Sequence, residues 1–255
     1  MEPDGNKLAF VGNEGGASDI YSYDLVSKEL NNLTNDVFSD TEPSWSPDGS
    51  KIVFASDRGK NVDNQSIAVN EMISHNYSQK NIYTINLDSK KIVQITDTEY
   101  NENYPIFSNT KNMLLYTADY QGTWNLFHHD LDTGESTVVT NLLTGLFQLS
   151  LTKDDGSLVF SGYSGLGWDV YRLNNPFDLD EVSVKPTNYI ENRKKNDEEE
   201  LADLRKHKRK GTQAMTTDYS SYIFAYEYEH YNDKDFEQDP IALKPDSAFM
   251  GSDGE

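Results

Sequence analysis

A nucleophilic serine would be looked for first at Ser164, in the segment GYSGLG at residues 162–167. The sharp turn that exposes such a serine has the pattern Gly-x-Ser-x-Gly. Here Gly165 follows Ser164 directly, and Leu166 stands where the second glycine should be. The five histidines offer no general base at the spacing of a known motif: His75, His128, His129, His207 and His230. The sequence therefore predicts no catalytic residue and a protein that is not an enzyme.

Metal ligation receives equally little support from the spacing of possible ligands. His128 and His129 are adjacent, so in a strand they point to opposite faces and cannot chelate one ion together. The acidic clusters at residues 130–135 and 178–181 do not fit the calcium loop D-x-[DN]-x-[DN]-G. We expect these carboxylates to serve turn chemistry and surface charge, and we predict no metal and no cofactor.

The charge of the chain restricts its partners. Lys and Arg number 22 against 43 Asp and Glu, which gives a formal net charge of −21. This charge repels nucleic acid and anionic lipid, so nucleic acid is excluded as a partner and a protein or peptide is expected. The sequence has no cysteine, and no apolar run approaches the roughly 18 residues of a membrane span. It does not indicate the oligomeric state.

The elements that must position any site come from a repeat with a period near 44 residues. One aromatic ladder has spacings of 44, 62 and 44 residues, and its members are Phe10, Phe54, Tyr116 and Phe160. A second ladder, in the strand that follows, has spacings of 62, 44 and 44, and its members are Tyr21, Tyr83, Phe127 and Tyr171. Alternating β-rich segments with this period are typical of propeller blades. The sequence predicts an all-β, partial β-propeller of about four 44-residue, four-stranded blades.

The second copy carries 18 extra residues, which we place within residues 59–80. Loops between blade strands lie on the faces where partners bind, so this insertion is the predicted partner-binding loop. An unengaged surface loop is the alternative. Trp124 and Trp168, just before third-strand aromatics, either pack between blades or face a partner. The candidate partner-binding residues are Ser66, Asn70, Glu71, His75, Asn76, Tyr77, Trp124 and Trp168.

Tight turns separate the predicted strands. In residues 47–49, Pro47 fixes φ, Asp48 can bond its own backbone, and Gly49 accepts positive φ, which a hairpin needs. The equivalent turns lie at residues 3–5, 109–112 and 154–156. We expect Trp45, just before this turn, to lie in the core.

The segment WSPDGSKIVFAS at residues 45–56, with DIY at 19–21 and LT at 33–34, resembles the TolB-like propeller (PD40) repeat over residues 1–182. The resemblance implies a non-enzymatic binding or scaffolding module of the bacterial cell envelope, periplasmic or attached to the outer membrane. The same motif occurs in propellers of prolyl oligopeptidase-like serine peptidases. A peptidase propeller without its catalytic domain is therefore the alternative function.

The two ends of the chain depart from the repeat. The first copy starts at the turn before its second strand, so we expect an incomplete first blade. We also expect a fragment of a longer protein whose secretion signal lies upstream; a small four-bladed protein that starts at Met1 is the alternative. Residues 183–212 are predicted to be a charged helical linker, with Asn196 or Asp197 as the helix cap. Residues 213–255 are predicted to begin a further, partly disordered domain with one strand.

Overall fold

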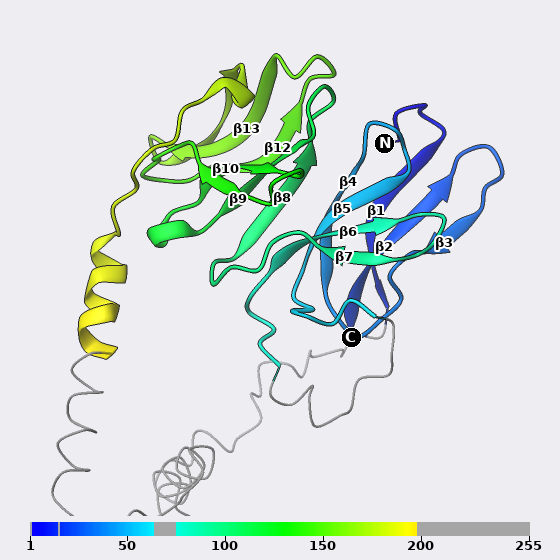
Figure 1. The fold of residues 1–255 in the computed structure, drawn as a ribbon, viewed down its shortest axis with the longest axis horizontal. Helices are drawn as coiled ribbons and strands as arrows, with labels where there is room; N and C mark the ends of the chain where they lie inside the picture. Colours follow the sequence, from blue (N-terminus) through cyan, green and yellow to red (C-terminus); the bar gives the residue numbers. More distant parts are fainter. Residues whose placement is uncertain (1, 15, 64–74, 198–255) are drawn as a thin grey trace, which may run out of the picture. The chain divides into compact units, whose positions relative to one another are not determined.

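Four antiparallel sheets make up most of the described chain (Figure 1). The computed structural model describes residues 2–14, 16–63 and 75–197. The chain divides into two compact units, residues 1–194 and 195–255, and nearly everything described lies in the first. Within the described residues, no helix is both long and apolar enough to cross a membrane. We call the four sheets blades 1 to 4 in chain order.

Each blade is built from strands that follow one another in the chain, so hairpins make every connection within a blade. Blade 1 consists of β1 (Lys7–Glu14), β2 (Ala17–Asp24) and β3 (Leu30–Asn32). Blade 2 consists of β4 (Asp40–Trp45), β5 (Lys51–Ser56), β6 (Asn81–Asn86) and β7 (Ile92–Gln94). Blade 3 consists of β8 (Glu102–Phe107), β9 (Met113–Ala118), β10 (Asn125–Asp130) and β11 (Ser136–Val138). Blade 4 consists of β12 (Phe147–Leu151), β13 (Ser157–Ser164) and β14 (Gly167–Asn174).

The predicted all-β, propeller-like class is confirmed, with one difference in strand number. Blades 2 and 3 have the four strands that the repeat predicts. Blade 1 has three strands, without an inner strand before β1 among the described residues. Blade 4 also has three, because the described chain turns after β14 into a short 3-10 helix, Pro176–Asp178, whose proline cannot donate a ladder hydrogen bond.

The two aromatic ladders are direct cross-strand partners in all four blades. Phe54 on β5 lies opposite Tyr83 on β6, with ring centroids 6.0 Å apart. The same register recurs in the other three blades as Phe10 with Tyr21, Tyr116 with Phe127, and Phe160 with Tyr171. Paired aromatics on one face of a sheet stabilise a register that a one-residue slip would destroy.

Apolar side chains from neighbouring blades form three cores. Ile20 and Leu33 of blade 1 pack with Phe54 and Tyr83 of blade 2 in the first core. The second core joins blades 2 and 3, and the third joins blades 3 and 4. Every interior blade therefore uses both faces, one against the preceding blade and one against the following blade, which explains why its central strands are buried without alternation.

A bulge occurs at the same place in the first strand of blades 2, 3 and 4. The register shifts just after the start of β4, β8 and β12. The residues in the left-handed region at these shifts are Glu42, Tyr104 and Gln148, with φ of 59°, 54° and 57°. The Glu42 carboxylate accepts a hydrogen bond from the Tyr104 backbone N–H at 2.6 Å, so the bulge of blade 2 is hydrogen-bonded to the bulge of blade 3.

The helical segment begins earlier than the sequence predicted. Residues 188–197 are helical, so Asn196 and Asp197 lie inside the helix, and the prediction that either caps its start is wrong. Thr187 precedes the helix and takes that place: its Oγ1 accepts from the Ile190 N–H at 3.5 Å. The predicted domain at residues 213–255, with its strand, lies outside the described residues.

Candidate partner-binding site on the loop side of blade 2

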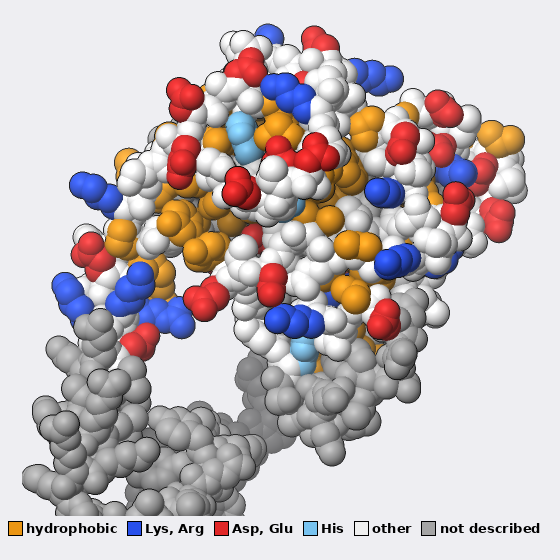
Figure 2. All heavy atoms as spheres, viewed as in Figure 1, with side chains coloured by type: hydrophobic (Ala, Val, Ile, Leu, Met, Phe, Trp, Pro, Cys, Tyr) orange, Lys and Arg blue, Asp and Glu red, His pale blue; other side chains and the backbone are white. Residues whose placement is uncertain are grey.

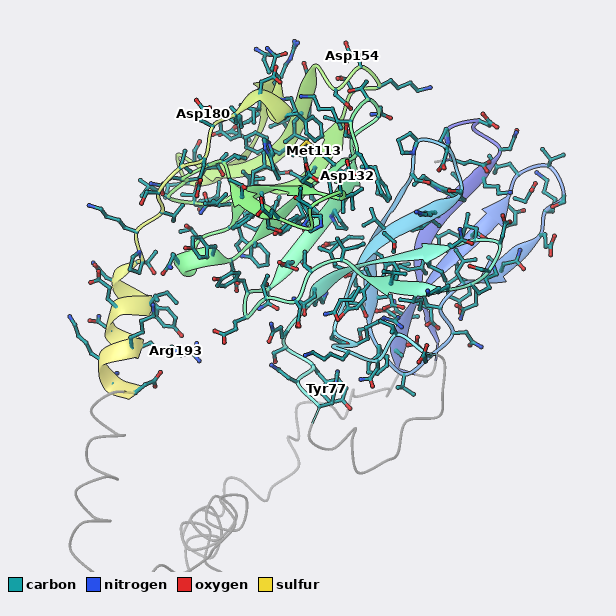
Figure 3. The ribbon with its side chains drawn as sticks, viewed as in Figure 1. Tyr77, Met113, Asp132, Asp154, Asp180 and Arg193 are labelled. Carbon is teal, nitrogen blue, oxygen red and sulfur yellow. The ribbon has the colours of Figure 1, made fainter. Side chains whose placement is uncertain are left out.

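The insertion lies where the repeat placed it, between β5 and β6. Its connection runs from residue 57 to residue 80, and residues 64–74 are outside the description. Three candidate residues, Ser66, Asn70 and Glu71, fall in that gap. His75, Asn76 and Tyr77 are described, and Tyr77 is half exposed at this end of the connection (Figure 3).

A surface cavity of about 380 Å³ lies where the insertion meets the loop between β7 and β8. Two of the predicted residues, His75 and Asn76, line it, whereas Tyr77, Trp124 and Trp168 do not. The complete lining is Asp57, Gly59, Lys60, His75, Asn76, Gln79, Asn81, Asp97, Thr98 and Glu99. Sequence reasoning thus found one wall of this cavity and missed the wall from residues 97–99.

The lining is polar and predominantly acidic. Asp57, Asp97 and Glu99 supply three carboxyl groups, and the one lysine in the lining, Lys60, lies 3.5 Å from the Asp97 carboxylate. Burial raises the pKa of Asp57. The hydrogen bond that its carboxylate accepts from the Ser39 backbone N–H, at 2.8 Å, partly offsets this rise. An opening with this excess of acceptors suits a ligand that brings donors or positive charge.

His75 anchors the described end of the insertion to the blade. Its Nε2 lies 2.7 Å from the Asp57 carbonyl oxygen, which can only accept, so Nε2 carries the hydrogen. The imidazole packs against Phe38 on one side and Tyr77 on the other, with ring centroids 5.2 and 4.8 Å away. The contacts make His75 a positioning residue for the cavity wall.

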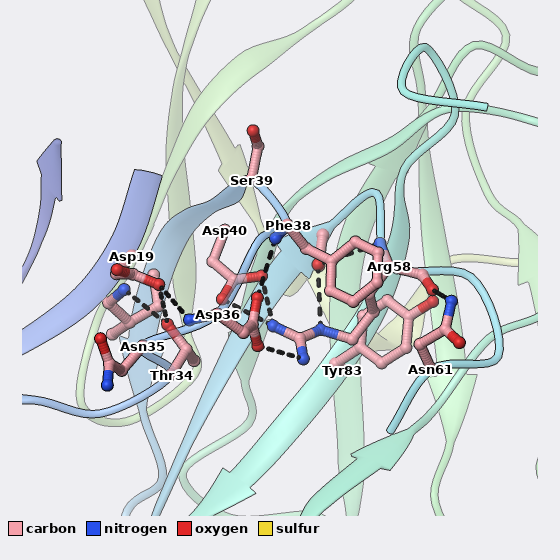
Figure 4. A network of polar contacts seen from close by, with 12 residues as sticks. Asp19, Thr34, Asn35, Asp36, Phe38, Ser39, Asp40, Arg58, Asn61 and Tyr83 are labelled. Carbon is pink, nitrogen blue, oxygen red and sulfur yellow. Dashed lines mark hydrogen bonds and ion pairs between the residues drawn. The ribbon is translucent and has the colours of Figure 1, made fainter. Parts of the chain in front are cut away.

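A buried arginine follows the cavity-lining Asp57 in the chain and forms the network of polar contacts drawn in Figure 4. Arg58 follows Asp57 directly, and its side chain is 1% exposed. The guanidinium donates to both Asp40 oxygens at 2.7 and 2.6 Å and to Asp36 at 2.9 Å. It also lies over three rings, 5.4 to 5.7 Å from the centroids of Phe38, Phe54 and Tyr83. A guanidinium paired with two carboxylates in this way holds the start of the insertion in place.

Three carboxylates, Asp19, Asp36 and Asp40, converge beside Arg58, with ligand oxygens within 4.8 Å of one another. This cluster draws on two blades and the loop between them, so no local motif revealed it. Arg58 already supplies the counter-charge for Asp36 and Asp40, and Thr34 donates to Asp19 at 3.1 Å. We therefore interpret the cluster as an ion-paired junction between blades 1 and 2. One signal was available in the sequence: the charged pair Asp57-Arg58 directly after the apolar strand KIVFAS.

Burial governs the ionisation of the carboxyl groups at the start of β4 and of β8. It raises the pKa of Asp40 to about 6, although Arg58 opposes the shift. Glu102, the counterpart of Asp40 in blade 3, is not paired with an arginine among the described residues, and burial raises its pKa to about 7. Hydroxyl groups stabilise its carboxylate instead: Thr96 donates to one oxygen, and Thr98 donates to the other at 2.9 Å.

The two candidate tryptophans belong to a different row of aromatic side chains. Phe147 lies between them, with ring centroids 6.1 Å from Trp124 and 5.5 Å from Trp168. Tyr163 extends the row, 5.7 Å beyond Trp168. Trp124 is half-buried between blades 3 and 4, whereas Trp168 is exposed. The sequence missed Phe147 and Tyr163 because no aromatic recurs at the equivalent positions of the other blades.

The serine and the two adjacent histidines considered for catalysis and metal binding each form a hydrogen bond within the fold. Ser164 ends β13 in a strand-to-strand hairpin, where its hydroxyl donates to Asp169 at 2.8 Å. His128 contacts the Pro176 carbonyl through Nε2 at 2.7 Å, and His129 contacts the Ser136 hydroxyl through Nδ1 at 2.9 Å. Burial lowers the pKa of both histidines.

Successive hairpin-built sheets that share cores face to face define a β-propeller architecture. Residues 1–71 match the family model described as the TolB beta propeller domain. The Tol-Pal system protein TolB of Francisella tularensis subsp. mediasiatica is 24% identical over 164 residues, which are 63% of this chain and 34% of that protein. The chain thus spans about a third of the length of the curated relatives it matches.

Solved structures agree on the fold. TolB from Acinetobacter baumannii superposes with a TM-score of 0.55 at 19% identity, over 73% of this chain and 42% of that one. A putative TolB from Agrobacterium tumefaciens gives 0.55 at 17% identity, over 68% and 59%. Together with the repeat, these likenesses identify the fold as a β-propeller similar to that of TolB.

Proposed function

We propose that this chain is a non-enzymatic, protein- or peptide-binding module of the bacterial cell envelope, and that the insertion with its cavity is the contact surface. The observation that carries the proposal is the cavity itself. One of its walls is formed by the connection that departs from the repeat, and two of the residues selected from the sequence line it. A periplasmic or outer-membrane-associated location follows from the resemblance to proteins named for the Tol-Pal system.

Electrostatics favour a neutral or basic partner. The chain carries a net charge of −21, and Figure 2 shows Asp and Glu side chains spread over the face in view with fewer Lys and Arg among them. The cavity repeats this excess locally through Asp57, Asp97 and Glu99. A basic segment that enters it would gain attraction during both encounter and docking.

A charge-reversal experiment tests this function. The 255-residue chain is used to capture proteins from an envelope extract of its source bacterium, and the purified candidate is then titrated by calorimetry. The variant Asp97→Lys with Glu99→Lys should weaken binding by roughly tenfold or more. Asp180→Lys with Glu181→Lys makes the same charge change at exposed positions away from the lining and should leave the affinity within about twofold. Equal loss in both variants would show that net charge, rather than the cavity, governs binding.

A further inference from the structure

A second cavity, of about 470 Å³, lies between blades 2 and 3. Blade 2 lines it with residues of β5, β6 and β7, and blade 3 lines it with the end of β8 and the turns that follow β8 and β10. None of its described lining residues belongs to the cavity at the insertion. The volume is within the range of ordinary ligand pockets, so this second cavity is a separate candidate site.

The described lining of the second cavity is basic, although the chain as a whole is strongly acidic. It contains Lys51 and Lys91 but no Asp or Glu. Neither lysine forms an ion pair with a residue that the structure describes. Four apolar side chains share the lining with them: Val93, Ile95, Phe107 and Leu131. The cavity therefore suits a ligand that combines an apolar group with a negative charge.

Between blades 3 and 4, the chain itself supplies such a group. Phe177, in the 3-10 helix after β14, is 8% exposed and belongs to the third core. Its ring stacks on His128 with centroids 5.8 Å apart, and Nε2 of His128 lies 2.7 Å from the Pro176 carbonyl oxygen. The Lys111 Nζ lies 5.7 Å from the centroid of the Phe177 ring and 3.1 Å from the Asp178 carboxylate. An aromatic residue followed by an acidic one thus packs against the blades beside a lysine.

The repeat makes the two places equivalent. Thr84 and His128 each follow the second-ladder aromatic of their blade, and each faces a blade whose first strand ends at Phe107 or Leu151. Thr84 and Phe107 line the cavity. Of their counterparts, His128 stacks on Phe177, and Leu151 packs against the core that contains Phe177. The Phe177 ring therefore lies, between blades 3 and 4, at the place that corresponds to the cavity between blades 2 and 3.

The course of the chain after each blade explains why only one of the two places is filled by the described residues. At Asn175 the backbone enters the left-handed region, with φ of 49°, and turns into the 3-10 helix. The equivalent residue of blade 3 is Leu131, from which the chain continues through a hairpin turn into β11. This turn, residues 131–135, contains no aromatic residue, so blade 3 has no counterpart of Phe177.

We propose that the second cavity binds a segment of a protein partner in which an aromatic residue is followed by an acidic one. The ring packs against the apolar lining, as Phe177 packs in the third core, and the carboxylate pairs with Lys51 or Lys91. This goes beyond the proposed function, because it concerns another surface and a segment of opposite charge. Since the net charge of −21 repels acidic segments in general, binding has to depend on these local groups.

A peptide with the sequence of residues 174–179 is the probe for this cavity. It is amidated at its C-terminus and labelled at its N-terminus with an uncharged fluorophore, so its one carboxylate is that of Asp178. Titration with the full chain, followed by fluorescence anisotropy, should give saturable binding. The probe with Phe177→Ala should bind roughly tenfold or more weakly, because it lacks the ring that the apolar lining would cover.

Filling the cavity tests where the probe binds. Val93→Trp adds a bulky ring to the lining and should raise the dissociation constant roughly tenfold or more. The matched control is Val26→Trp, at a 76% exposed position in the turn between β2 and β3, and it should stay within about twofold of wild type. Circular dichroism checks that both variants are folded, and the lysine variants below test the same cavity independently.

Charge is tested on both partners. Lys51→Gln with Lys91→Gln should raise the dissociation constant roughly 3- to 10-fold. Lys28→Gln with Lys153→Gln makes the same charge change at exposed positions outside the described lining and should stay within about twofold. The probe with Asp178→Asn should bind wild type and the Lys51, Lys91 variant equally, because the carboxylate that couples to these lysines is gone.

Three results would overturn the proposal. The first is the absence of saturable binding up to about 1 mM chain. The second is an equal dissociation constant for Val93→Trp and Val26→Trp. The third is weaker binding in Lys111→Gln with none in the Lys51, Lys91 variant, which would mean that the probe replaces residues 176–178 between blades 3 and 4.

Discussion

The carboxylate of Asp155 accepts a hydrogen bond from the Ser108 hydroxyl at 2.6 Å, although the two residues belong to turns of different blades. The turn of blade 3 has no aspartate of its own, and Asp155 from blade 4 also accepts from the backbone N–H groups of Asn109 and Thr110. Burial opposes its charge, but these donors lower the pKa of Asp155 to about 2. The carboxylate therefore fastens blade 4 to blade 3.

Asp155→Asn should lower the free energy of unfolding by about 1.5–3 kcal/mol, because the amide cannot accept all of these hydrogen bonds. Asp154→Asn is the matched control. Asp154, in the same turn (Figure 3), accepts from Thr152 and from the Gly156 N–H and is exposed, so Asp154→Asn should lower the free energy of unfolding clearly less than Asp155→Asn does. Urea unfolding at neutral pH measures both variants. Equal losses would mean that the inter-blade contact adds nothing.

Arg58→Met should destabilise the protein by about 3–5 kcal/mol at neutral pH, since it leaves Asp40 buried without its counter-charge. The loss should shrink near pH 5, because burial already raises the pKa of Asp40 to about 6 and the unpaired acid can take up a proton. Lys60→Met removes a lysine whose ion pair with Asp97 is exposed and should change stability by less than about 0.5 kcal/mol. Denaturant unfolding at both pH values checks this; a loss below about 1 kcal/mol for Arg58→Met would contradict it.

Glu102 should make the protein less stable as pH rises. Its pKa is about 7 in the folded protein against an ordinary value of 4.5, so the folded state holds a proton that the unfolded chain releases earlier. Stability from this group is full below pH 4.5 and is lost as pH rises through 7, by at most about 3 kcal/mol. Glu102→Gln should remove that slope, so the unfolding free energies of wild type and variant should diverge between these pH values. Parallel curves would refute the assignment.

Leu126→Ala and Val170→Ala compare equivalent positions of blades 3 and 4. Leu126 is buried beneath blade 4, so its truncation leaves a cavity and should cost about 2–5 kcal/mol. Val170 is exposed, and its truncation should cost less than about 0.5 kcal/mol when unfolding is followed at low protein concentration. Similar costs at both positions would contradict the arrangement of blades described above.

Deletion of residues 62–79 should leave the blades folded. Residues 57–61 and 80 would then join β5 to β6, which matches the length of residues 119–124 between β9 and β10. Of the contacts described, the deletion removes those of His75, the hydrogen bond from Gln79 to the Thr98 carbonyl and the packing of Val62 against the first core, so we expect a loss of about 1–2 kcal/mol with a cooperative thermal transition. Loss of cooperativity, or of the β-sheet circular dichroism signal, would show that the insertion is part of the blade core.

The sequence by itself determined the repeat and its two aromatic ladders, because strand periodicity and turn residues are local properties that recur every 44 residues. The pairing of Phe54 with Tyr83, across the connection at residues 57–80, was seen only in the structure. The insertion was placed by the same counting, since it is the one break in that period. His75 and Asn76 were selected with it, and both line the cavity.

Only the tertiary structure decided what lies between blades. Arg58 forms an ion pair with Asp40 of the neighbouring strand, and Asp155 accepts a hydrogen bond from Ser108 of another blade. The spacing of these residues along the sequence matches no known motif. Val170 and Ile82 are equivalent in the repeat, yet one is exposed and the other is buried. The physical reason is that hydrogen-bond register is fixed within a hairpin, whereas burial and ion pairing depend on which surface packs against which.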